Sequence, residues 1–253
     1  QRAYRLDEAV PRPITPEPDV RAGDRYADYV FHNNLVICVR ERHRNSGEAV
    51  TQLVAFPIDG SAAPCPIASG HDFFSSPRVS PDGSLLAWLT WDHPNMPWDG
   101  TELWVAELAS DGRVTNRERV AGGSDESLFQ PEWSPDGRLH FVSDRNGWWN
   151  LYRLEDSGEV AAVCPMEAEF GVAQIQFGYR RYGFVSSTQI VATFDRDGNR
   201  LFKTQLSTAH WVVGEHRTAE NEALLPGTGY LEVAAQALEA QGETGPFEIR
   251  DLY

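Results

Sequence analysis

The sequence predicts a mainly β protein: an incomplete β-propeller of four-stranded blades, followed by a short α+β segment. A Ser-Pro-Asp-Gly tetrapeptide stands at 80–83 and again at 134–137, each time ahead of an alternating strand pattern. Four apolar segments of one type recur at intervals of 50, 48 and 50 residues, and they begin at Leu53, Leu103, Leu151 and Leu201. Short strands, tight turns and a long regular period are typical of propeller blades. A sandwich of irregular strands is the alternative interpretation.

The tight turns follow from the chemistry of their residues. Proline cannot donate a hydrogen bond to a strand ladder, and the Asp-Gly pair tolerates the positive φ angles of a hairpin turn. Asp-Gly pairs punctuate the chain at Asp59, Asp82, Asp99, Asp111, Asp136 and Asp197. The repeat therefore predicts a partial blade at 1–20 and blades at about 24–70, 72–123, 126–166 and 170–206. Because known propellers close with about four to eight blades, we expect further blades to complete the ring.

Composition restricts the possible partners. The chain has 253 residues, of which 41% are hydrophobic and 23% are charged, and its net charge is −15. A nucleic acid or an anionic membrane surface would require a basic face, so neither is expected as a partner. No segment has the length of apolar sequence that a membrane span needs, and no secretory leader is visible. We therefore expect a cytoplasmic protein.

The cysteines give no sign of a metal site or a disulfide framework. Cys38, Cys65 and Cys164 are scattered and form no Cys-x-x-Cys pair. Such a set predicts small buried hydrophobic residues in a reducing compartment rather than ligands. No metal and no other cofactor are expected.

Longer motifs around the two tetrapeptides carry a family resemblance. The segments 76–83 and 86–98 contain the run Trp-Asp-His-Pro-Asn-Met-Pro-Trp, and the segments 130–137 and 143–152 contain Asp-Arg-Asn-Gly-Trp-Trp-Asn-Leu-Tyr. With these motifs, residues 1–206 resemble the propeller of prolyl oligopeptidase-family serine peptidases. The resemblance implies that the propeller caps a separate α/β-hydrolase domain and restricts which peptides reach its active serine. The implied partners are a peptide substrate and that hydrolase domain.

The catalytic machinery of that family has no counterpart in this sequence. The active serine would stand in a Gly-x-Ser-x-Gly elbow, and no such motif occurs among the 253 residues. The segment 122–126 comes nearest and lacks the closing glycine. We therefore expect no residue of the peptidase triad here and no peptide cleavage by this chain alone, although the resemblance implies that it is a fragment of a hydrolase-family protein.

The last fifty residues change character. Apolar residues at Leu231, Ala234, Ala235 and Leu238 have helical spacing and predict one helix near 229–241. The runs 210–217 and 226–232 make residues 198–253 resemble the start of a polyketide synthase dehydratase domain, which is a hot-dog fold. The chain is thus expected to divide into 1–206 and 207–253, as a fusion joined near 198–210.

That second resemblance implies one candidate catalytic residue, His216. In the dehydratase family the histidine before the Pro-Gly-Thr turn removes the α-proton of a β-hydroxyacyl thioester held on an acyl carrier. A neutral imidazole suits proton abstraction near neutral pH. Glu220 stands where the family has glycine, and Pro226 lies ten residues after His216 rather than nine. The alternative interpretation of His216 is an exposed loop histidine.

Three further features have non-catalytic interpretations. His71-Asp72 and Asp92-His93 are expected to be polar loop pairs, because neighbours on a strand point to opposite faces. The tryptophans are expected to pack between blades. If the propeller contacts a peptide or a hydrolase domain, the loops 91–98 and 146–149 are the expected places. A free-standing propeller that binds a partner remains the non-enzymatic alternative.

Overall fold

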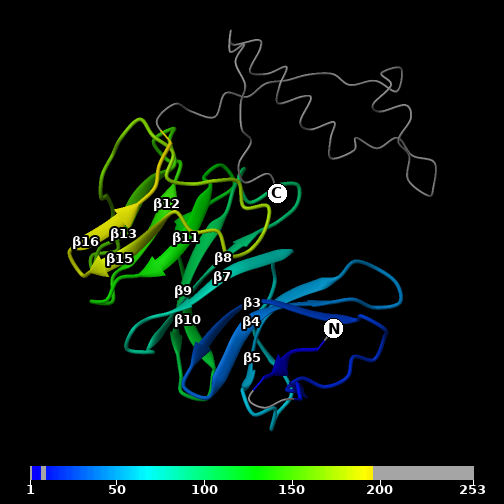
Figure 1. Ribbon diagram of the computed structural model, residues 1–253. Helices are drawn as coiled ribbons and strands as arrows, with labels where there is room; N and C mark the ends of the chain where they lie inside the picture. Colours follow the sequence, from blue (N-terminus) through cyan, green and yellow to red (C-terminus); the bar gives the residue numbers. More distant parts are fainter. Residues whose placement is uncertain (1, 7–9, 196–253) are drawn as a thin grey trace, which may run out of the picture. The chain divides into compact units, whose positions relative to one another are not determined.

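The computed structural model describes residues 2–6 and 10–195 (Figure 1). This part of the chain contains strands and no helices. Three antiparallel sheets have four strands each, in sequence order from one edge to the other. They are β3 (Asp24–His32), β4 (Leu35–Arg42), β5 (Val50–Pro57) and β6 (Cys65–Ala68); β7 (Phe73–Val79), β8 (Leu85–Trp91), β9 (Glu102–Leu108) and β10 (Val114–Gly122); and β11 (Leu128–Trp133), β12 (Leu139–Ser143), β13 (Asn150–Leu154) and β14 (Val160–Ala162).

Two smaller sheets flank these in the sequence. One pairs β1 (Tyr4–Arg5) with β2 (Arg12–Pro13), and the other pairs β15 (Tyr182–Ser186) with β16 (Gln189–Ala192). The predicted fold class, an incomplete propeller of four-stranded blades, is confirmed for the described residues. Leu53, Leu103 and Leu151 each stand on the third strand of a sheet, β5, β9 and β13. The expected α+β segment, the helix near 229–241 and the boundary at 206/207 lie outside the described residues.

The Ser-Pro-Asp-Gly turns join the first strand of a sheet to the second. In the later copy the Ser134 hydroxyl donates to Asp136 Oδ1 at 2.6 Å and accepts the Arg138 amide at 3.0 Å. The Ser80 hydroxyl donates to Asp82 in the same way and accepts the Leu85 amide at 2.9 Å. The glycine of each copy has a φ near +80°, 78° in one and 84° in the other. The repeated motif is therefore a local device that reverses the chain and satisfies its own polar groups.

Alternation along the second strand of each sheet places apolar side chains against both neighbouring sheets. On β8, Leu86 and Trp88 join a buried cluster with residues of β4 and β5, whereas Ala87 and Leu89 join a cluster with residues of β11 and β12. Two further clusters repeat this arrangement at either end, between β1–β2 and the first large sheet and between the third large sheet and β15. The cores thus lie between sheets, as propeller blades require.

Tryptophans contribute to these cores, as the sequence predicted. Trp88 and Trp104 stack with their ring centroids 6.5 Å apart, and Trp149 stacks on Phe129 at 6.4 Å. Trp133 donates its indole N–H to the Arg78 carbonyl of the preceding sheet at 2.9 Å. In the part of the chain that is described, no helix has the length and hydrophobicity to cross a membrane.

The close approach of Trp149 to Gly171 yields a stability prediction. A Cβ atom added at Gly171 would overlap the indole ring of Trp149, whereas a Cβ at Gly183 on β15 would meet open space. We expect Gly171→Ala to lower the free energy of unfolding by about 1–3 kcal/mol, because the partly buried indole ring of Trp149 must shift. Gly183→Ala is the matched control and should change it by less than about 0.5 kcal/mol. Urea unfolding of both variants checks this, and equal stabilities would show that the Trp149 contact is not tight.

Candidate functional site

The first strands of the three large sheets share an unusual backbone feature. In each, the register with the second strand shifts at one point: between Ala27 and Val30, between Ser75 and Arg78, and between Phe129 and Glu132. One non-glycine residue in each bulge has a positive φ: Asp28 at 54°, Ser76 at 54° and Gln130 at 47°. Because L-residues rarely adopt this conformation, three copies at equivalent places indicate a structural requirement.

The bulges bring polar side chains of neighbouring sheets together. Strand β7 contacts both β3 and β11. The Ser76 amide donates to Asp28 Oδ2 at 2.5 Å, and Arg78 Nη1 lies 3.8 Å from Asp28 Oδ1. Arg78 Nε also donates to Glu132 Oε1 at 3.0 Å, and Arg180 lies 3.4 Å from the same oxygen. This inner belt, Asp28–Ser76–Arg78–Glu132–Arg180, runs across four sheets or their flanking segments.

A second set of bonds joins Gln130 to the last sheet. The Gln130 side chain accepts the Arg181 amide at 2.6 Å and donates to the Tyr182 carbonyl at 2.7 Å. The phenolic hydroxyl of Tyr182 in turn donates a hydrogen bond to the Gln130 carbonyl at 2.9 Å. Burial raises the pKa of Tyr182 well above its ordinary value. The hydroxyl is therefore a neutral donor, and the bulge at Gln130 holds the start of β15 in place.

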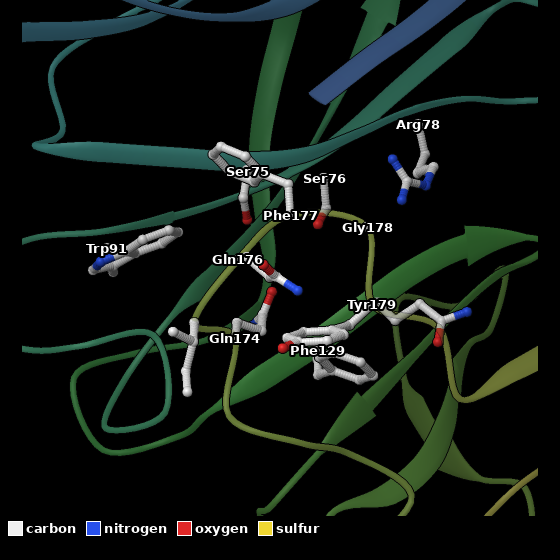
Figure 2. A pocket seen from close by; sticks show the side chains of 12 residues that line it. Ser75, Ser76, Arg78, Trp91, Phe129, Gln174, Gln176, Phe177, Gly178 and Tyr179 are labelled. Atoms are coloured by element: carbon white, nitrogen blue, oxygen red, sulfur yellow. The ribbon is translucent and has the colours of Figure 1, made fainter. Parts of the chain in front are cut away.

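Beside the belt, β7, β11 and the segment 174–179 enclose a pocket of about 130 Å³ (Figure 2). Its aromatic walls come from Trp91, Phe129, Phe177 and Tyr179. Its polar lining includes Ser75, Ser76, Arg78, Gln130, Gln174 and Gln176. The guanidinium of Arg78 is already held by Glu132 and the Pro77 carbonyl, so the pocket is hydroxyl- and amide-lined rather than cationic.

A second pocket of about 220 Å³ shares two walls with the first. Trp91 and Phe177 line both pockets, and the second continues over residues of β3, β4 and β5 together with Phe73 and Phe74. It contains mainly apolar side chains. The two pockets are therefore neighbours with Trp91 and Phe177 in common.

The residues singled out by the sequence fall in different places. Trp91, the first residue of the 91–98 segment, lines both pockets. Trp149, from the 146–149 segment, does not line a pocket that includes Trp91, but it stacks on Phe129, which lines the first pocket. Candidate base His216 lies outside the described residues. Ser75 and the 174–179 segment were missed, because no motif marks them.

The two histidine–acid pairs interact across strands rather than along the chain. His71 Nδ1 lies 2.8 Å from Asp92 Oδ2, and His93 Nδ1 lies 3.1 Å from Asp72 Oδ2. They flank the ladder of β7 and β8, in which Phe73 is opposite Trp91. Within residues 2–6 and 10–195, no group of three histidine, cysteine or carboxylate side chains is placed to hold a metal ion. Of the three cysteines expected to be buried, Cys38 is buried, whereas Cys65 and Cys164 are exposed, so for these two the expectation was wrong.

Comparison with known proteins finds similar structures among peptidases. A crystal structure of puromycin hydrolase matches with a TM-score of 0.71 and 37% sequence identity, over 77% of this chain and 32% of that one. A puromycin-hydrolyzing peptidase of Mycobacterium tuberculosis matches over the same shares, with 37% identity and a TM-score of 0.72. The resemblance to the propeller of prolyl oligopeptidase-family peptidases is confirmed. This chain spans about a third of the length of these structures.

Two further matches complete the comparison. Dipeptidyl-peptidase 5 of Porphyromonas gingivalis is 23% identical over 161 residues, which are 62% of this chain and 21% of that protein. The family described as the polyketide synthase dehydratase domain matches residues 188–253, so the second predicted resemblance is also confirmed. That match begins just before β16, within the last sheet of the propeller part.

The environment of Asp28 yields a pH prediction. Burial raises the pKa of Asp28 above its ordinary value of 3.8, against the lowering effect of the Ser76 amide and Arg78. The native protein therefore binds this proton more tightly than the unfolded chain. The resulting stabilisation is complete below about pH 3.8 and is lost as the pH rises through the native pKa. We therefore expect the unfolding free energy of wild type, taken relative to that of Asp28→Asn, to fall from pH 4 to pH 7.

Asp24, on the same strand, provides a control of opposite sign. Burial favours a raised pKa, but the bond from Arg42 at 2.9 Å and its charge outweigh burial and lower the pKa of Asp24. Its stabilisation is present above the unfolded pKa and is lost as the pH falls. Urea unfolding of Asp28→Asn and Asp24→Asn across this range should therefore show opposite trends, and parallel trends would contradict the assigned environments.

Proposed function

We propose that residues 1–206 are the non-catalytic propeller part of a prolyl oligopeptidase-like serine peptidase. In this role the propeller packs on an α/β-hydrolase domain and limits which peptides reach the active serine. The observation that carries the proposal is 37% identity over 77% of the chain to peptidases that hydrolyse puromycin. A further structure, of a puromycin hydrolase mutant, is a complex with PGG and has the same 37% identity to this chain.

The described side chains suit selection of peptides rather than their cleavage. The pocket beside the inner belt offers hydroxyl and amide groups together with aromatic walls, which match the hydrogen-bonding backbone and apolar side chains of a peptide. The inner belt fixes the relative position of strands β7 and β11, which line this pocket. Acyl transfer requires a nucleophile with its base and an oxyanion hole, and the Gly-x-Ser-x-Gly elbow that would supply the nucleophile is absent from the 253 residues.

Covalent labelling tests the non-catalytic role. We expect the purified chain to remain unlabelled by a fluorophosphonate serine-hydrolase probe and to release no amine from puromycin or from aminoacyl arylamides. A trypsin sample in the same buffer controls for probe activity. Stoichiometric labelling of this chain, or hydrolysis that the probe abolishes, would overturn the proposal.

The match at residues 188–253 favours a second candidate function, dehydration of a β-hydroxyacyl thioester. In this proposal His216 removes the α-proton of a substrate presented on an acyl carrier, and a carboxylic acid supplied elsewhere assists loss of water. Positioned general bases contribute about 10²–10⁴-fold to such reactions. His216 lies beyond the proposed propeller part, residues 1–206, so both functions can belong to one chain.

Substitution of the candidate base tests this second function. With β-hydroxybutyryl-N-acetylcysteamine as substrate, we expect His216→Ala to lower any dehydration rate by about 100-fold or more. His210→Ala, in the same segment, should retain the rate. Equal rates in wild type and His216→Ala would exclude His216 as the base.

A further inference from the structure

The pocket beside the inner belt contains a polar group with no internal partner. Ser75 is 3% exposed, and its hydroxyl is buried with no hydrogen-bond partner. Figure 2 shows this hydroxyl directed toward the pocket, on the same side as the side chains of Gln174 and Gln176. A buried hydroxyl without a partner costs stability. Its position at a pocket wall therefore points to a partner that arrives with a ligand.

The size and chemistry of the pocket restrict that ligand. A cavity of about 150 Å³ holds a benzene-sized group, and this pocket has about 130 Å³. Aromatic walls from Trp91, Phe129, Phe177 and Tyr179 suit a planar ring. Arg78 is the one lining residue with a charge, and its bonds to Glu132 and the Pro77 carbonyl occupy it. The pocket therefore fits an uncharged aromatic side chain.

The neighbouring pocket adds room for a second side chain of the ligand. It has about 220 Å³, is lined mainly by apolar side chains and shares Trp91 and Phe177 with the first pocket. An extended peptide places successive side chains on opposite sides of its backbone. Two adjacent side chains then enter the two neighbouring pockets, which share Trp91 and Phe177, while the backbone amide between them reaches the Ser75 hydroxyl.

We infer that this pair of pockets binds a dipeptide unit that places an uncharged aromatic side chain in the first pocket and an apolar side chain in the second. Ser75 is the hydrogen-bonding residue for the peptide backbone, and Phe177 separates the two side chains. The inference rests on the proposed function, because that function makes peptides the ligand class. The inference goes beyond that function by stating which peptides bind and which side chains of the propeller select them.

Peptide titration followed by NMR tests the inference. The probe is N-acetylphenylalanylleucinamide, and the comparison ligand is N-acetylaspartylleucinamide. Eight tryptophan indole N–H signals are available in a ¹⁵N-labelled chain, and Trp91→Phe assigns the one that borders both pockets. We expect the aromatic peptide to shift the Trp91 signal saturably and the acidic peptide to leave it unchanged.

Two variants and a control show whether binding uses this site. Ser75→Ala should weaken binding about fivefold while unfolding free energy stays equal or rises, because the hydroxyl has no partner to lose. Phe177→Ala should weaken binding by a similar factor, and Ser110→Ala, in the exposed turn after β9, should not change it. The inference is overturned by absence of saturable binding, by equal affinity of the acidic peptide, by unchanged affinity in both pocket variants, or by a destabilised Ser75→Ala.

None of these outcomes depends on serine-probe labelling, so failure of this inference is distinguishable from failure of the proposed function.

Discussion

The inner belt of polar contacts between the first strands is the constraint on which the rest of the described structure depends. Each four-stranded sheet is held internally by its ladder, but its neighbours are joined through side chains. Arg78 is bound to Glu132 of the next sheet and lies near Asp28 of the previous one, and these three side chains are only 9–17% exposed. Partly buried ion pairs are costly to break, because one charge then remains without a partner. The belt therefore fixes how successive sheets are placed.

Packing and recognition both follow from this placement. The apolar clusters form because alternate residues of one strand face two different sheets, and such clusters need those sheets at a fixed spacing. The bulges that turn Asp28, Ser76 and Gln130 toward neighbouring strands also open the space beside Ser75 and Phe129. The three strained bulges thus lie beside the pocket in which, among the described residues, the unpaired Ser75 hydroxyl meets aromatic walls.

The sequence predicted those features that depend on local chemistry. The two Ser-Pro-Asp-Gly turns and the strands at Leu53 and Leu103 were visible because turn residues and alternation act over a few positions. The bulges could not be predicted from the sequence. Asp28, Ser76 and Gln130 have a positive φ where these bulges contact neighbouring sheets, through residues about fifty positions away. The pairing of His71 with Asp92 likewise depends on the register of β7 and β8. The pocket could not be predicted either, because part of its lining comes from the segment 174–179, which has no periodic pattern.

A double-mutant cycle on Arg78 and Glu132 tests the role of the belt most directly. Unfolding free energies would be measured for wild type, Arg78→Met, Glu132→Gln and the double variant. The account predicts a coupling energy of about 1–3 kcal/mol, because the two side chains share a short bond in a partly buried place. Additivity within about 0.5 kcal/mol would show that the sheets are positioned by their apolar clusters alone and would contradict the account.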